Sequence, residues 1–238
     1  MLPKIKSPLL KTALPVNGAK IDYRPYTLKE EKILLLGLRS DDVDGPVNAV
    51  KQVINNCIQT AGFDVEAMST FDLEFFLVKL RIASVGEVME LTFKDPDDEQ
   101  SYTVRINLPS VLDDIVSKLV IPDKVIHLND EVGVEMRDIT FDMLMSNDMA
   151  DINDPEKVYD ILPKIMKHVF DKDNIYPFEE ATREDVEEFF DSFDRNATQR
   201  LAEYLTSIPH LHHTVSYTNS QGTVRNIELN GLSDFFQL

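Results

Sequence analysis

The sequence has a single cysteine, Cys57, and no tryptophan among its 238 residues. One cysteine cannot form a disulfide within the chain, so disulfide-stapled folds and zinc sites made of several cysteines are excluded. Long hydrophobic runs are also lacking, because Ile33–Leu36 and Ile82–Val85 with their flanks fall far short of the about 20 apolar residues that span a bilayer. The opening residues, Met1–Lys4, lack the apolar core of a signal peptide. We therefore expect a soluble protein of a reducing compartment with no membrane partner.

Positive charge is scarce. The chain has 24 Lys and Arg residues against 42 Asp and Glu residues, which gives a formal net charge of −18. Such a chain repels nucleic-acid phosphates, and no cluster of Lys and Arg offsets the repulsion, so a nucleic-acid partner is excluded. The hydrophobic content of 43% is too high for a disordered acidic chain. The acidity serves solubility or complements a basic surface of another protein.

Sequence signatures of enzymatic chemistry are missing too. The chain contains neither of the glycine-rich phosphate-binding patterns and no HExxH zinc-protease pattern. Cys57 lies on the apolar face of a predicted helix with no basic neighbour, which is typical of a core residue. Adjacent carboxylates such as Glu187 and Glu188 diverge on a helix, so they do not form an acid–base pair. We predict a protein that is not an enzyme and binds no cofactor.

Two segments raise the question of a metal site. His210, His212 and His213 lie at a helix-to-strand corner, where His210 and His212 would share a strand face and could chelate a metal. A metal-dependent hydrolase built on this cluster is the alternative from a different class of function. Asp171–Asn174 has the beginning of a calcium loop, but Ile175, Tyr176 and Thr182 occupy the ligand and glycine positions. We expect no metal at either segment.

The residues that are present predict helices followed by local hairpins. Asn17-Gly18 is typical of a type I′ turn between two strands. Thr27 and Glu30 form a capping-box pattern ahead of an apolar helix. The predicted helices span residues 28–38, 47–60, 71–81, 111–119, 155–170 with a break at Pro163, 183–193 and 197–207. The predicted strands span residues 14–16, 19–23, 88–93, 102–108, 125–128, 133–137, 213–218 and 223–229.

This pattern predicts an α+β fold in which helices pack against antiparallel β-hairpins, since the strands come in local pairs without βαβ alternation. We expect two blocks. Residues 1–150 form a hairpin-plus-helices domain with a central hairpin. Residues 151–238 form an acidic helical block with a C-terminal hairpin.

Two surfaces are candidates for protein contacts. The segment 171–195 has 10 acidic and 3 basic residues, and Glu184, Glu187 and Glu188 on its predicted helix are candidate partner-binding residues. Phe235 and Phe236 in the apolar tail either pack on the core or bind a partner. The methionines of residues 142–150 likewise either fill gaps in the core or provide an adaptable binding face.

Short segments along the whole chain carry a resemblance to a known family. In chain order they are Leu2–Lys4, Asn17-Gly18, Ile21–Tyr26, Lys29–Leu35, Asn56-Cys57, Phe71–Phe76, Leu80-Arg81, Ser84–Glu87, His213–Thr218 and Gly231–Phe236. In their order and spacing they resemble the T-even-type bacteriophage baseplate hub assembly family. Some relatives place cysteines in the hairpins, whereas this chain has Asp95–Glu99 and Asn219–Gly222 there, so a zinc ribbon is not expected.

The resemblance implies a viral protein made in the bacterial cytoplasm and used when the central hub of a contractile tail is built. Its partners would be other baseplate hub proteins or tape-measure proteins, and self-association stays open. The resemblance brings no catalytic residues. It also leaves open whether the protein stays in the virion tail baseplate or acts as a tail assembly chaperone that is absent from the mature virion.

Overall fold

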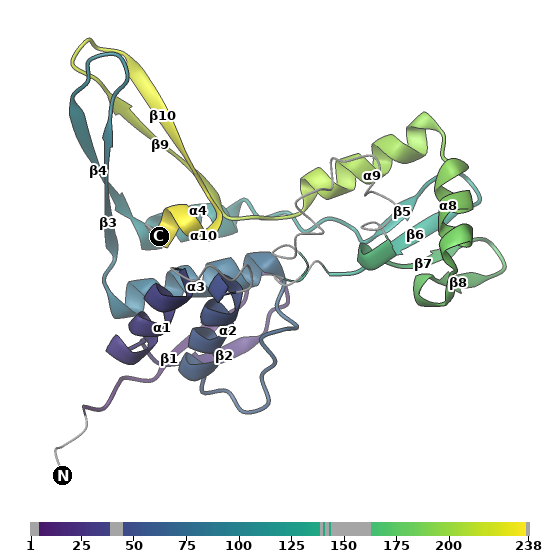
Figure 1. The fold of residues 1–238 in the computed structure, drawn as a ribbon, viewed down its shortest axis with the longest axis horizontal. Coiled ribbons are helices and arrows are strands. Elements are labelled where there is room, and N and C mark those ends of the chain that lie inside the picture. The colour runs from purple at the N-terminus through teal and green to yellow at the C-terminus, as the bar shows by residue number, and fades with distance from the viewer. Residues whose placement is uncertain (1–4, 39–44, 139, 141–142, 144–162, 237–238) are drawn as a thin grey trace. The chain divides into compact units, whose positions relative to one another are not determined.

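The computed structural model describes residues 5–38, 45–138, 140, 143 and 163–236 (Figure 1). It combines helices with three two-stranded sheets and one four-stranded sheet, all antiparallel. The predicted α+β class is confirmed. No helix in the described ranges is long and apolar enough to cross a membrane.

The chain forms two compact units. The first unit comprises residues 1–119 and 210–238, and the second comprises residues 120–209. The boundary that we predicted near Ala150 lies outside the described residues. The two units do not coincide with the predicted blocks, because the C-terminal hairpin belongs to the first unit.

The first unit begins with a hairpin of β1 (Leu10–Ala13) and β2 (Lys20–Tyr23). The turn is longer than the predicted type I′ turn, because the amide of Gly18 donates to the carbonyl of Leu14 at 3.0 Å. Gly18 has a positive φ of 70°, while Asn17 does not adopt a positive φ. The amides of Val16 and Asn17 instead donate to the buried carboxylate of Asp72, which explains why the turn departs from the two-residue form.

Helix α1 (Leu28–Leu38) begins and ends where the sequence predicts. Glu30 reaches back to accept a hydrogen bond from the amide of Thr27 at 2.9 Å, as in a capping box. The Thr27 hydroxyl differs from that pattern, because it donates to Glu30 at 2.6 Å. Arg24 pairs with the same carboxylate at 3.0 Å, so the cap also joins the helix to the end of β2.

Helices α2 (Gly45–Cys57) and α3 (Thr70–Ser84) both bury many apolar side chains in the core of the first unit. The Ser69 side chain caps α3 by accepting from the amide of Asp72. All residues from Thr70 to Val78 are buried, so this broadly apolar helix is central to the unit.

Two seven-residue hairpins complete the first unit. Strands β3 (Val88–Lys94) and β4 (Ser101–Asn107) form one, and β9 (His212–Thr218) and β10 (Val224–Asn230) form the other. In each strand, residues that are at least partly buried alternate with exposed ones. Figure 1 shows the two hairpins extending side by side from the helices of this unit, with their turns close together. Each hairpin runs directly into a helix, α4 (Leu108–Ser117) after β4 and α10 (Gly231–Phe236) after β10.

The second unit is a small α+β body. Its sheet has the order β5-β6-β7-β8, made of β5 (Val125–His127), β6 (Gly133–Met136), β7 (Met166–Phe170) and β8 (Ile175–Pro177). The 3₁₀ turn η1 (Phe178–Glu180) leads to α8 (Arg183–Asp191) and α9 (Arg195–Ser207). Side chains of the sheet and the two helices share one core, which includes Val134, Met166, Phe190 and Leu201.

The predicted helix over residues 155–170 is wrong in its last five residues. Met166–Phe170 forms β7, which pairs with β6 on one side and with β8 on the other. Backbone hydrogen bonds on both edges of this central strand outweigh the local helical pattern. Residues 155–162 of the predicted helix lie outside the described residues, as does the methionine-rich segment except Met143, which packs against the second core.

Candidate functional site

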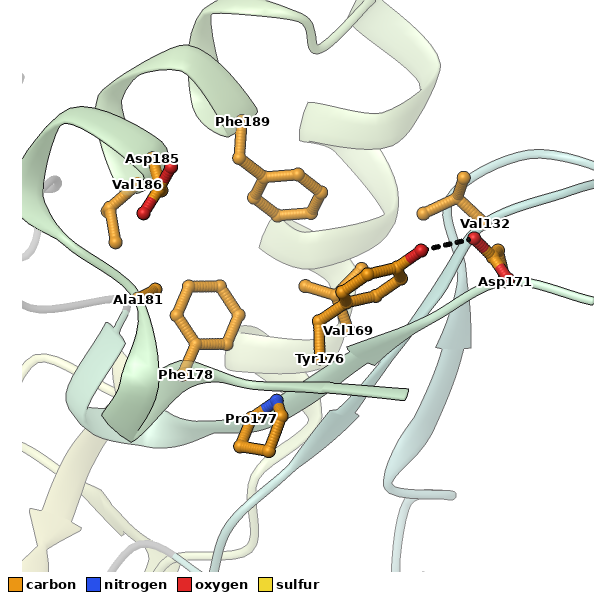
Figure 2. Close-up of a pocket in the computed structure, with 10 residues that line it drawn as sticks. All are labelled: Val132, Val169, Asp171, Tyr176, Pro177, Phe178, Ala181, Asp185, Val186 and Phe189. Carbon is orange, nitrogen blue, oxygen red and sulfur yellow. Dashed lines mark hydrogen bonds between the residues drawn. The ribbon is translucent and has the colours of Figure 1, made fainter. Parts of the chain in front are cut away.

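An apolar cavity of about 270 Å³ opens on the second unit between its sheet and α8 (Figure 2). Side chains from β7, β8, η1 and α8 surround it, together with Val132 ahead of β6. The lining residues are Val132, Val169, Asp171, Tyr176, Pro177, Phe178, Ala181, Asp185, Val186 and Phe189. Figure 2 shows the rings of Tyr176, Phe178 and Phe189 around the open centre of this cavity.

The wall formed by α8 is the edge of an aromatic cluster. Phe189 contacts Phe178 edge to face with 5.9 Å between ring centroids, and it contacts Phe193 edge to face at 4.9 Å. Phe190 lies on the buried side of the cluster at 5.5 Å from Phe189. Because these rings hold one another in place, the cavity wall is largely preformed.

Two carboxylates stand at the rim of the cavity, Asp171 after β7 and Asp185 in the first turn of α8. Asp171 accepts hydrogen bonds from the amides of Asp173 and Asn174 at 2.8 and 2.7 Å and from the Tyr176 hydroxyl at 2.9 Å. Those hydrogen bonds lower the pKa of Asp171. Hydrogen bonds from the hydroxyl and amide of Thr182 lower the pKa of Asp185 in the same way. Both groups are therefore anionic at neutral pH.

Tyr176, which lines the cavity, is also 50% exposed. Its neighbour in β8, Ile175, is 66% exposed on the opposite face of the strand, because successive side chains of a strand alternate. A half-exposed aromatic ring beside an apolar cavity with a charged rim is typical of a protein-binding site.

In the first unit, a network of polar side chains joins the turns of the two long hairpins. Asp95, which is fully buried, accepts hydrogen bonds from the Tyr217 hydroxyl and from the Asn219 amide. Ser220 bonds to Asp98 through its backbone amide and its hydroxyl, and Arg225 pairs with Asp97. We call this set of residues, together with Tyr102, the hairpin latch.

Aromatic rings support the hairpin latch. Tyr217 packs on Phe93 and on Tyr102, with centroid distances of 4.5 and 5.0 Å. Burial and the bond to Asp95 raise the pKa of Tyr217 to about 12, so its hydroxyl stays protonated and donates. The acidic turn Asp95–Glu99 thus joins the two hairpins, because its carboxylates accept hydrogen bonds from residues of the other hairpin.

A buried carboxyl group, Glu74 of α3, joins that helix to the base of the C-terminal hairpin. It is 7% exposed and accepts a hydrogen bond from the amide of Leu211 at 2.8 Å. Burial raises the pKa of Glu74 to about 7, although the hydrogen bond from the Leu211 amide lowers it in part. The buried position of Glu74 was not predicted from the sequence.

Of the three histidines, His210 and His212 lie close together, with 6.1 Å between their ring centroids. His212 bonds to Glu228 at 2.6 Å on the exposed face of the hairpin, and the half-buried His213 occupies the alternate position of the strand. No group of three or more His, Cys, Asp or Glu residues suited to a metal ion occurs in the described parts of the chain. Asp171 closes the turn between β7 and β8, which explains why the Asp171–Asn174 segment looked like the start of a calcium loop.

Cys57 is fully buried in α2, and burial raises the pKa of its thiol to about 11. The thiol is therefore protonated at neutral pH and lacks the reactivity of a nucleophile.

The predicted partner-binding residues fall in different environments. Glu184, Glu187 and Glu188 are exposed on α8, and Glu187 pairs with Arg183 at 2.8 Å. They do not line the cavity, which takes Asp185, Val186 and Phe189 from the same helix. Phe235 is fully buried in the first unit, in agreement with the alternative that it packs on the core, and nothing is described of the Phe236 side chain.

Sequence reasoning missed the residues of the cavity itself. One signal in the sequence was the high density of phenylalanine in this acidic segment, at Phe178, Phe189, Phe190 and Phe193, which indicates more apolar surface than a solvent-exposed acidic helix requires. The contribution of Val132 and Val169 could not be found, because it depends on the pairing of β6 with β7 across an intervening segment.

A family model described as "T4 bacteriophage base plate protein" matches residues 7–237. No curated protein and no solved structure matches.

Proposed function

Since the chain belongs to the T4 bacteriophage base plate protein family, we propose that it acts in assembling the central hub of the baseplate by binding other tail proteins. The observation that carries this proposal is the length of the family match, which spans residues 7–237 and thus both compact units. The proposed action is non-enzymatic, and it takes place in the host bacterial cytoplasm during assembly.

The surfaces described above support a role in protein contacts. An apolar cavity with an anionic rim, exposed apolar side chains in β8 and the exposed carboxylates of α8 all suit binding to basic surfaces of other proteins. We include Glu184, Glu187 and Glu188 in the proposed contact surface. Phe235 is not accessible in the folded first unit, so a contact through it would require the tail to detach.

Affinity purification from infected cells tests the proposal. A tagged copy of the chain should co-purify with baseplate hub or tape-measure proteins, and chemical cross-links should join it to them. Recovery without any tail protein, from cells that are assembling tails, would contradict a role in hub assembly.

Mass spectrometry of purified virions separates the two forms of the proposal. Peptides of this chain in mature particles identify it as a component of the baseplate hub. Their absence, combined with co-purification from infected cells, identifies it as a tail assembly chaperone.

Metal analysis tests the rival hydrolase hypothesis for His210, His212 and His213. Protein purified without chelators should contain no stoichiometric metal, and its melting temperature should not change on adding EDTA. A bound transition metal that is lost when His212 is changed to Ala would revive the hydrolase hypothesis.

A further inference from the structure

The size of the second-unit cavity limits what it can hold. Its volume of about 270 Å³ lies just below the range of about 300–1,000 Å³ in which whole small-molecule ligands bind. Valine and phenylalanine side chains supply five of its ten lining residues, and all five belong to the core of the unit or pack against it. A single large apolar side chain matches this space and this chemistry.

The rim of the cavity selects the charge of whatever approaches. Amide and hydroxyl donors of the chain bond to Asp171 and Asp185 and lower the pKa of each carboxyl group, so both are anionic at neutral pH. The surrounding segment 171–195 adds further negative charge, with 10 acidic against 3 basic residues. An approaching segment with Lys or Arg near its apolar side chain would therefore be favoured, while a second copy of this acidic chain would be repelled.

From this geometry we propose that the second-unit cavity binds one large apolar side chain of a partner protein, in a segment that carries Lys or Arg on both sides. The apolar side chain enters between Phe178, Val186 and Phe189, and the flanking cations lie against Asp171 and Asp185. The proposed function enters this proposal at one point only, since it identifies the partner as a tail protein.

The exposure of Tyr176 supports the same occupant. This side chain lines the cavity and is 50% exposed, so a peptide seated there would contact it as well. Tyr176 is held against Asp171 by its hydroxyl, which keeps its ring at the cavity edge, as Figure 2 shows. A flanking cation can then also interact with the face of this ring.

A methyl NMR titration of the full chain tests the proposal with three synthetic peptides. The probe is acetyl-Lys-Lys-Phe-Lys-Lys-amide, and the matched peptides replace Phe by Ala or all four Lys by Glu. The first peptide should shift the methyl signals of Val169, Ala181 and Val186 and bind about tenfold more tightly than either matched peptide. Equal binding of all three, or no shift of these methyls at millimolar peptide, would overturn the proposal.

Substitutions locate the binding. Ala181→Trp places a large side chain at the cavity mouth and should weaken binding of the first peptide about tenfold, whereas Ala202→Trp on the exposed face of α9 should leave it unchanged. The pair Asp171→Asn and Asp185→Asn keeps an oxygen that accepts the backbone amides at each position, while the new side-chain amide at position 171 can donate to the Tyr176 hydroxyl. This double change should remove most of the difference between the Lys and Glu peptides. Equal effects of both Trp variants would contradict the assignment.

These results are independent of the test of hub assembly. If the peptides do not bind but tail proteins co-purify, the cavity proposal fails and the proposed function stands. If the peptides bind as expected but no tail protein co-purifies, the proposed function fails while the binding chemistry of the cavity is retained.

Discussion

Glu74 shows how one residue can make the stability of the first unit depend on pH. Its carboxyl group is buried in α3 and bonds to the amide of Leu211, which joins the central helix to the C-terminal hairpin. Burial raises its pKa from the usual 4.5 to about 7. The folded state therefore holds the proton more tightly than the unfolded state, and stability falls as the pH rises between about 4.5 and 7.

This linkage predicts the effect of Glu74→Gln. The shift corresponds to about 3 kcal/mol of stability that the wild-type chain loses between pH 4.5 and pH 7 and does not regain above it. The variant cannot ionise, so its unfolding free energy should be flatter over this range in urea titrations. Glu66→Gln, at a largely exposed position, is the matched control and should keep the wild-type slope. A Glu74→Gln slope equal to that of the wild type would show that the carboxyl group does not titrate as described.

Phe235 gives a second test at the scale of a residue. Because its side chain is fully buried, Phe235→Ala should cost about 3–5 kcal/mol of unfolding free energy in a urea melt. A loss below about 1 kcal/mol would instead fit an exposed residue. Such a result would restore the alternative that this part of the tail serves a partner.

At the scale of elements, the hairpin latch predicts that the two hairpins of the first unit are coupled through their turns. Tyr217→Phe removes the hydroxyl that donates to the buried Asp95, while the ring contacts with Phe93 and Tyr102 remain. Amide hydrogen exchange should become about tenfold faster in both turns, residues 95–100 and 219–223. Thr218→Val, at an exposed neighbouring position, is the control. Faster exchange in only one turn would contradict coupling.

Helix α8 predicts a charge-dependent contact. The triple change of Glu184, Glu187 and Glu188 to Lys reverses an exposed surface without touching the core, so co-purification with tail proteins should fall about tenfold or more. The melting temperature should change little, although the pair between Arg183 and Glu187 is lost. Glu31, Glu66 and Glu87 changed together to Lys give the same change in net charge elsewhere and should leave co-purification intact. If both triple variants bind equally, α8 is not the contact.

Elements with strong local signals could be predicted from the sequence. The helix predicted over residues 71–81 lies within α3, and the two long hairpins followed from alternation of apolar and polar residues along their strands. Strand β7 could not be predicted, since its partner β6 lies about thirty residues earlier and its other partner, β8, is only three residues long. The first turn was also missed, because Asp72, far along the chain, takes its amides.

The candidate site was predicted only in part for a related reason. The negative charge of residues 171–195 is a property of the sequence, and it pointed to α8. Which face of α8 meets a cavity depends on where β7, β8 and η1 place their side chains, so Asp185 and Phe189 were missed while Glu184 and Glu187 were chosen.

At the scale of the whole molecule, the family match and the two compact units describe one chain that combines a helical first unit bearing two latched hairpins with a small acidic second unit. Each unit has its own core, and the second carries the cavity with the anionic rim. Chains of this design suit assembly through several separate contacts, which is the role we propose in the baseplate hub.

The most direct test is deletion of the gene from the phage, followed by sedimentation and electron microscopy of the tail structures made in infected cells. Without the protein, complete baseplates should be absent, incomplete baseplate parts should accumulate, and plaque formation should return when the gene is supplied from a plasmid. Normal baseplates and normal plaque formation after deletion would contradict the account.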